Sequence, residues 1–250
     1  MARYPKQGDP GGKNVIPSVT EIIGDCTDKS GALTQWAANM VVEYLKEHCW
    51  IDGYYEVDDE ALDSARFNFK TVSQKALDIG SEVHNAIEKL MQDKTYELTT
   101  KEALNAFDAF MSWAKEHNLK PNALEMTVYG ETNGNPWAGT LDFFGEFDGK
   151  LYVIDWKSSA PANKKTGKGI RKDMRIQVAA YRWAVEQPSA IIPFDTNPCD
   201  GCGVLRLDKE TGLPDFVDTS KSYNQDLKIF NRMVDLYFER HPIIRKRARG

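Results

Sequence analysis

Several features that define other protein classes are missing from this 250-residue chain. No apolar run approaches the length of a membrane span. The N-terminal stretch is polar and rich in Gly and Pro, so it lacks the apolar segment of a secretory signal. Four cysteines in a chain of this length do not suggest a disulfide framework. Together these absences favour a reducing, cytoplasmic setting.

The motifs of several enzyme classes are also missing. The sequence contains no H-E-x-x-H, no G-x-S-x-G, no P-loop and no G-x-G-x-x-G. Nothing therefore supports a zinc protease, a serine hydrolase or a nucleotide-binding enzyme that carries these motifs. Without a P-loop there is no visible ATP motor, and any helicase activity must come from a partner protein.

An overall excess of positive charge is missing too. The formal net charge is −5, which does not suit a protein that coats nucleic acid with its whole surface. Positive charge is instead gathered in two segments, and the remainder of the chain is acidic. One segment holds Lys164, Lys165, Lys168, Arg171, Lys172 and Arg175, and the other is the tail with Arg245, Lys246, Arg247 and Arg249.

What the chain does have is an ordinary hydrophobic content of 41%. The apolar residues recur with helical periodicity first and with strand periodicity further along the chain. Ser18 and Glu21 form the pattern of a capping box at a helix start. Further helices are predicted over residues 33–47, 59–69, 73–91, 100–117, 172–185 and 224–239. An antiparallel three-strand meander is predicted over residues 123–131, 137–147 and 151–156, and a late hairpin over residues 204–207 and 215–219. This order predicts an α/β or α+β layered domain, with a central mixed sheet flanked by helices and an N-terminal helical region.

Three polar side chains on two of these strands carry the predicted chemistry. Side chains alternate between the faces of a strand, so Asp155 and Lys157 point to the same face. The Asp148-Gly149 turn folds this strand onto its predecessor, which lets Asp142 approach Asp155. Two facing carboxylates favour a hard divalent cation, and a neighbouring lysine could orient or polarise an attacking water. This is the chemistry of phosphodiester hydrolysis; the alternative is an ordinary surface ion pair at a strand end.

Other polar residues accompany this set along the chain. His84 lies on a helix before the strands, and Gln177 and Tyr181 lie one helical turn apart after them. Ser158 and Ser159 follow the lysine directly and could donate hydrogen bonds to a phosphate. The alternatives are a structural histidine, an exposed glutamine and a core tyrosine.

The series G-x-x-x-H, G-T-L-D, D-W-K-S and Q-x-x-x-Y resembles the RecB-like branch of the PD-(D/E)XK nuclease superfamily. Within it, the chain looks like the phage-type exonucleases related to mitochondrial genome maintenance exonuclease, also through residues 17–23 and 36–38. In motif order the resemblance covers residues 15–190, and it is most specific over residues 139–181. It implies a restriction-endonuclease-like core, and a bacterium or a phage-infected host cell as the setting.

The resemblance implies a metal site. Asp142, Asp155 and the backbone carbonyl of Trp156 would bind the metal, with His84 as an additional ligand. The implied cofactor is Mg²⁺ or Mn²⁺, as one or two ions. Some relatives hold an iron–sulfur cluster with one early and three late cysteines; the late triplet is absent, so no cluster is expected. Cys199-x-x-Cys202 is half a zinc site in spacing, but is expected to flank a tight turn.

The resemblance also implies roles for residues that do not bind the metal. Lys157 would position or activate the water, while Gln177 and Tyr181 would steady the active site and the DNA end. Either Glu125 or Glu131, on the strand before Asp142, would support the site.

The predicted function is a metal-dependent DNA exonuclease that acts on DNA ends in recombination, repair or replication. The choice of DNA and of exonuclease rests on the resemblance. An endonuclease with the same site and a non-catalytic nucleic-acid-binding protein remain the alternatives. DNA ends are the predicted partner, in single-stranded or double-stranded form, together with a recombination or replication protein. The basic cluster is predicted to contact DNA, with a solvated loop as the alternative: Ser158, Ser159, Lys164, Lys165, Lys168, Arg171, Lys172 and Arg175.

The predicted organisation is a flexible N-terminus over residues 1–14, a single nuclease domain over residues 15–240 and a basic tail over residues 241–250. Within the domain, residues 15–72 form a helical subregion and residues 73–220 form the catalytic core.

Overall fold

The computed structural model describes residues 3–5, 15–161, 163, 165–187 and 199–242. The predictions for Lys164 and for the basic tail from residue 243 onward lie outside the described residues. Contacts within the chain define two compact units. The smaller unit is Thr27–Ser81, and the larger one is formed by the described residues on either side of it.

Two tight turns shape the sheet of the larger unit. The φ angles are 52° and 73° at Asn133-Gly134, and 50° and 77° at Asp148-Gly149. Positive φ at both central residues is the turn geometry that closes a two-residue hairpin. The first turn joins β5 (Leu119–Thr132) to β6 (Asn135–Phe147), and the second joins β6 to β7 (Lys150–Lys157). Both strand pairs are antiparallel.

Two further strands complete a mixed sheet of five strands in the order β5-β6-β7-β8-β9. β8 (Gly201–Leu207) runs parallel to β7, and β9 (Pro214–Asp218) runs antiparallel to β8. β5 lies at an edge of this sheet and contains Pro121, which has no N–H for the ladder. The register shifts between Pro121 and Ala123, so the proline coincides with an irregularity of the edge strand.

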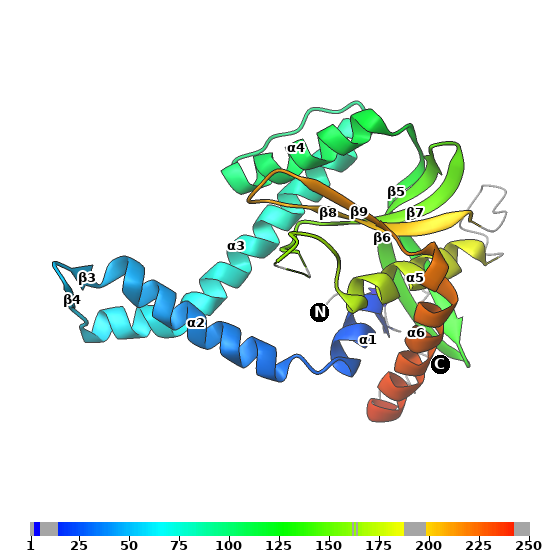
Figure 1. The fold of residues 1–250 in the computed structure, drawn as a ribbon. Coiled ribbons are helices and arrows are strands. Elements are labelled where there is room, and N and C mark those ends of the chain that lie inside the picture. Colours follow the sequence, from blue (N-terminus) through cyan, green and yellow to red (C-terminus); the bar gives the residue numbers. More distant parts are fainter. Residues whose placement is uncertain (1–2, 6–14, 162, 164, 188–198, 243–250) are drawn as a thin grey trace. The chain divides into compact units, whose positions relative to one another are not determined.

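Helices cover both faces of this sheet (Figure 1). α1 (Val19–Cys26), α5 (Lys172–Glu186) and α6 (Tyr223–Arg240) pack together on one face, and bury a large apolar core with the strands. α4 (Lys101–Glu116) covers the other face, where Phe110 and Trp113 meet Trp156. The larger unit is therefore layered, with a central mixed sheet flanked by helices, as the sequence predicts.

The N-terminal part of the larger unit is tied to its core. Ser18 Oγ accepts a hydrogen bond from the Glu21 N–H at 2.9 Å, which confirms the predicted helix cap of α1. The Glu21 carboxylate accepts the hydroxyl of Tyr237 on α6 at 2.7 Å. β1 (Arg3–Pro5), which lies in the 1–14 segment predicted to be flexible, pairs with β2 (Val15–Pro17) directly after it. A short 3₁₀ turn, Ser220–Ser222, leads into α6.

The smaller unit is a helical hairpin with a β-turn at its tip. It contains α2 (Ser30–His48), the antiparallel pair β3 (Trp50–Ile51) and β4 (Tyr54–Tyr55), and the part of α3 (Asp59–Met91) up to Ser81. The prediction of two helices over 59–69 and 73–91 is wrong, because one helix runs through both. Residues 70–72 contain neither glycine nor proline, so nothing there interrupts the helical hydrogen bonds.

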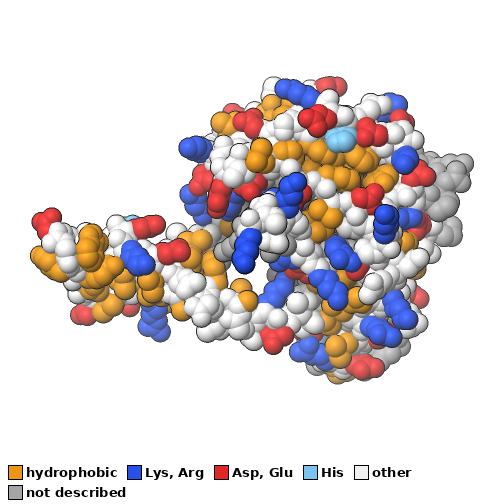
Figure 2. Space-filling view, in the orientation of Figure 1, with side chains coloured by type: hydrophobic (Ala, Val, Ile, Leu, Met, Phe, Trp, Pro, Cys, Tyr) orange, Lys and Arg blue, Asp and Glu red, His pale blue; other side chains and the backbone are white. Residues whose placement is uncertain are grey.

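Hydrophobic side chains gather on the surface of this smaller unit (Figure 2). The exposed ones include Leu33, Val42, Trp50, Tyr54, Tyr55, Leu62 and Leu77. None of the helices formed by the described residues combines the length and the apolar character that a membrane crossing requires.

Candidate active site

Neighbouring positions on β6 and β7 carry the predicted site aspartates, Asp142 and Asp155. Phe143 pairs with Ile154, and Asp142 and Asp155 are the next residues along this ladder. The backbone N–H of Trp156 donates a hydrogen bond to Asp142 Oδ2 at 2.6 Å. Both carboxylates are buried, so each is shielded from bulk water.

Lys157 lies beside Asp155 on the same face of β7. Its Nζ is 2.5 Å from Asp155 Oδ2, while Trp156 between them points to the opposite face and packs against Phe110 and Phe143. The end of β7 therefore carries Asp155 and Lys157 on one face and Trp156 on the other, which is the alternation that the sequence predicts. The catalytic roles of these residues remain predictions.

The C-terminal part of α3 brings a histidine to the same place. His84 Nδ1 is 3.5 Å from Asp142 Oδ1 and 3.4 Å from Glu125 Oε1. One ligand atom from each of His84, Glu125 and Asp142 lies within 4.8 Å of the other two. Among the described residues this group does not include Asp155, whose Oδ2 is paired with Lys157.

Electrostatics link these groups. Burial on its own would lower the pKa of His84, but the charge of Asp142 and hydrogen bonds to Asp142 and Glu125 outweigh it and raise that pKa to about 10. Burial would likewise raise the pKa of Asp142, yet the charge and hydrogen bond of His84 bring it below the ordinary value. An imidazolium thus compensates the Asp142 carboxylate.

Asp155 and Lys157 behave differently. Burial raises the pKa of Asp155 to about 7, although the charge of Lys157 opposes the rise. Burial would lower the pKa of Lys157, but the charges of Asp155 and Asp142 raise it, so the ammonium stays protonated. The two aspartates therefore differ in character, because one is firmly ionised and the other titrates near neutral pH.

The donor set fits a divalent cation. Asp155 is 1% exposed, and its Oδ1 accepts no hydrogen bond from any described residue. A buried carboxylate oxygen without a donor is unfavourable, and a cation would satisfy it. Carboxylate oxygens suit Mg²⁺ and Mn²⁺, and the added imidazole nitrogen suits Mn²⁺ better than Mg²⁺.

The Q-x-x-x-Y pair on α5 packs against the strand that carries Asp142. Gln177 Nε2 donates to the Tyr181 hydroxyl at 2.9 Å. A Cβ at Gly139 would overlap Tyr181 Cε1 and lie 3.2 Å from Cζ and Oη, so the glycine of G-T-L-D makes room for this ring. Tyr181 is buried, and burial raises its pKa well above the ordinary value with help from the charge of Asp155. It therefore reaches the site as a neutral hydroxyl.

The basic segment after β7 is anchored by a buried arginine of β8. Arg206 Nη1 lies 3.4 Å from the Ser159 carbonyl, and Nη2 donates to the Gly167 carbonyl at 2.8 Å. Asp215 of β9 accepts the Gly169 N–H at 2.6 Å. The Ser159 Oγ is buried and makes no hydrogen bond to a described residue.

The predicted DNA-binding cations differ in availability. Lys165, Lys168 and Lys172 are exposed. Arg171 is exposed but ion-paired with Asp173 at 3.2 Å. Arg175 makes a bidentate pair with the buried Asp226 of α6, so its charge is compensated within the fold. Ser158 is half-buried directly after Lys157.

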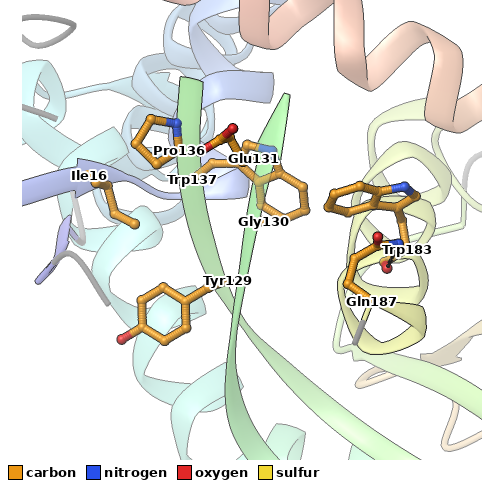
Figure 3. Close-up of a pocket in the computed structure, with 8 residues that line it drawn as sticks. All are labelled: Ile16, Tyr129, Gly130, Glu131, Pro136, Trp137, Trp183 and Gln187. Carbon is orange, nitrogen blue, oxygen red and sulfur yellow. Dashed lines mark hydrogen bonds between the residues drawn. The ribbon is translucent and has the colours of Figure 1, made fainter. Parts of the chain in front are cut away.

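An open cavity of about 330 Å³ lies along β5 and β6, and its lining includes none of His84, Asp142, Asp155 and Lys157. Figure 3 shows Trp183, Gln187 and Tyr129 around it, with Glu131 beside the two strands. Of the two glutamates that the sequence offers as support for the site, Glu131 therefore lines the cavity and Glu125 contacts His84.

Comparison with known proteins gives one curated relative. The chain is similar to mitochondrial genome maintenance exonuclease 1 of Homo sapiens. The two are 28% identical over 212 residues, which cover 81% of this chain and 52% of the human protein. The chain thus spans about half the length of the curated relative that it matches. No family model matches the chain.

Solved structures that match the chain include two proteins, both at a TM-score below 0.5. A proposed exonuclease from Eubacterium rectale has a TM-score of 0.42 at 16% identity, with 89% of this chain and 88% of that chain covered. SSO0001 has a TM-score of 0.37 at 12% identity, with 84% of this chain and 88% of that chain covered.

Glu125 is the residue of this site that sequence reasoning did not single out. The sequence offers two glutamates on one strand and no pattern that separates them. What separates them is the pairing of β5 with β6, which places position 125 beside Asp142. Pro121, two residues before the predicted strand 123–131, is a sequence signal of an irregular edge strand, but does not identify Glu125.

Proposed function

We propose that this protein is a divalent-cation-dependent DNA exonuclease of the PD-(D/E)XK type, RecB-like branch, with a restriction-endonuclease-like core. The observation that carries the proposal is the meeting of His84, Asp142, Asp155 and Lys157 beside β6 and β7. The similarity to a mitochondrial exonuclease supports an exonuclease and DNA as its substrate. The motif order favours a phage-type enzyme that processes DNA ends in recombination, repair or replication.

The cation would be Mg²⁺ or Mn²⁺, as one or two ions. Asp142, Asp155, the Trp156 carbonyl and His84 would hold it, since these groups combine oxygen donors with one imidazole nitrogen. When bound, such a cation neutralises charge on a phosphate and lowers the pKa of a bound water. The buried, hydrogen-bond-free Oδ1 of Asp155 supports a cation at this place.

Lys157 would orient the attacking water. Its ammonium is fixed by Asp155 Oδ2 at 2.5 Å and stays protonated, so it donates hydrogen bonds from a set position. A water held there would have its lone pair directed to the phosphorus and its protons toward an acceptor carboxylate. Gln177 and Tyr181 would steady this arrangement from α5.

The basic segment would follow the DNA backbone. Lys165, Lys168 and Lys172 are exposed and near in sequence to Lys157, and Ser158 could donate to a phosphate. Arg171 and Arg175 would contribute less, because their charges are compensated by Asp173 and Asp226. The proposed setting is the cytoplasm of a bacterium or a phage-infected cell, with a recombination or replication protein as a partner.

Digestion of end-labelled linear DNA beside covalently closed circles tests the proposal. With Mg²⁺ or Mn²⁺ the linear DNA should be degraded and the circles should remain, and EDTA should stop the reaction. Lys157→Ala should lower the rate by about 10²–10⁴-fold. Lys150→Ala, an exposed lysine at the other end of the same strand, is the matched control and should retain full activity.

Each other outcome identifies a rival. Cleavage of closed circles would make the protein an endonuclease with the same site. Persistent DNA binding without cleavage in either cation would make it a non-catalytic binding protein. Equal activity of Lys157→Ala and the wild type would remove Lys157 from the chemistry.

A further inference from the structure

Glu125 occupies an unusual position in β5. Leu124 pairs with Phe143 and Met126 pairs with Leu141; between these pairs Glu125 and Asp142 form no regular bridge, but their side chains lie within 4.8 Å of each other. Like charges this close on neighbouring strands repel each other. The structure thus sets two carboxylates against each other at an edge strand, an arrangement that needs positive charge between them.

The backbone of Glu125 is equally unusual. Its φ is 45°, in the left-handed region that a residue with a Cβ rarely adopts. Among the described residues, the other non-glycine residues with positive φ are Asp52, Asp93, Asn133 and Asp148, all of them Asn or Asp. Glu125 alone in this group lacks the short side chain that tolerates this conformation. Strained residues of this kind are typical of functional sites.

The Glu125 carboxylate lies near His84 Nδ1, the atom that the Asp142 carboxylate also approaches. Its Oε1 is 3.4 Å from His84 Nδ1, which is 3.5 Å from Asp142 Oδ1. Beside this group lies Asp155, which is 1% exposed and keeps one oxygen without a hydrogen bond from the described residues. The charges of Asp142 and His84 both act on it, so it belongs to the same charged cluster.

We infer that Glu125 is a further protein ligand of the divalent cation that His84 and Asp142 would hold, an inference that rests on the proposed function. A cation held by the Glu125 and Asp142 carboxylates would relieve their repulsion, the role that the His84 imidazolium fills without it. Glu125 then supplies a ligand from β5, in addition to those from α3, β6 and β7. The strained backbone is what turns its carboxylate toward the other two groups.

Calorimetric titration of the full chain with Mn²⁺ alone tests this inference. Glu125→Gln preserves the size of the side chain and should bind Mn²⁺ roughly ten- to a hundredfold more weakly than the wild type. Glu131→Gln, on the same strand and away from the cluster, should bind like the wild type. Saturating Mn²⁺ should also raise the Tm of the wild type and of Glu131→Gln more than that of Glu125→Gln.

Two further measurements separate ligation from its rivals. Glu125→Asp keeps the charge but shortens the reach, so it should not restore wild-type affinity; full restoration would show that only the charge matters. Water-proton relaxation counts the waters on bound Mn²⁺, and Glu125→Gln should gain about one water in place of the carboxylate. An unchanged count would mean that Glu125 only orients His84, which overturns the inference.

The inference and the proposed function fail in different ways. If the wild type degrades DNA and Glu125→Gln binds Mn²⁺ as tightly as the wild type, the nuclease stands and Glu125 is no ligand. If Mn²⁺ binds through Glu125 but DNA stays intact, the cation site stands and the nuclease does not. A wild type that binds no Mn²⁺ would overturn both.

Discussion

Gly139 offers a test of how tightly the strand that carries Asp142 is packed against α5. In Gly139→Ala, the added Cβ would overlap Tyr181 Cε1, with Cζ and Oη 3.2 Å away. Tyr181 is only 3% exposed, so the ring has little room to withdraw. Inserting a methyl group into such a packed place costs about 1–3 kcal/mol. For a chain of this size, each kcal/mol lowers the Tm by about 2–4 °C, so the expected fall is about 2–12 °C.

Gly24 supplies the matched control. It lies within α1, and a Cβ there meets nothing within 4 Å. Because alanine is a better helix former than glycine, Gly24→Ala should stabilise the protein by about 0.5–1 kcal/mol. The same chemical change should therefore have opposite signs at the two positions, as measured by thermal and urea unfolding.

A double-mutant cycle identifies the cause. Tyr181→Leu removes the atoms that the new Cβ would meet, so Gly139→Ala should cost at least 0.5 kcal/mol less in that background, by the order of magnitude expected for residues in contact. An unchanged Tm for Gly139→Ala, or simple additivity of the two substitutions, would contradict the close packing of Gly139 against Tyr181 that the structure shows.

Three further predictions concern the stability of the larger unit. Arg206→Met should lower the free energy of unfolding by about 3–5 kcal/mol in urea, because it leaves Asp208 and Asp215 without their buried partner; a change below about 1 kcal/mol would contradict this. Burial opposes the lowering of the pKa of Asp208, but backbone N–H groups and Arg206 outweigh it. A lowered folded-state pKa contributes stability that is present above the ordinary value of about 4 and lost as the pH falls through the lowered one. Asp208→Asn should thus destabilise at pH 7 and have little effect once the pH is below that pKa, and an equal effect at both pH values would refute the linkage. Ser18→Ala should lower stability by about 1 kcal/mol through loss of the Glu21 N–H acceptor, and unchanged urea unfolding would show that another group caps α1.

Local patterns predicted much of the fold. Asn133-Gly134 and Asp148-Gly149 close hairpins because both residues of each turn accept positive φ. The period of two along β7 placed Asp155 and Lys157 together and Trp156 on the other face. These features depend on neighbours in sequence, so a reader of the chain can predict them. The predicted break at residues 70–72 was wrong, because one helix runs through these residues and no glycine or proline there interrupts it.

Other features depend on contacts between distant segments. The parallel insertion of β8 beside β7 joins residues that are about fifty positions apart, and no local pattern specifies it. The ion pair of Arg175 with Asp226 is of the same kind, because the sequence shows a basic cluster and not its partner. Whether a basic side chain is free to contact a ligand therefore depends on the tertiary structure around it.

By itself the sequence determined that Asp142, Asp155 and Lys157 lie within reach of one another, since side-chain alternation and turn residues act over a few positions. Only the tertiary structure decided which other groups join them. His84 arrives from α3, and Glu125 rather than Glu131 faces Asp142, because the register of β5 against β6 selects one glutamate of the two. Strand register is set by the packing of whole strands, so local sequence patterns around the two glutamates do not reveal it.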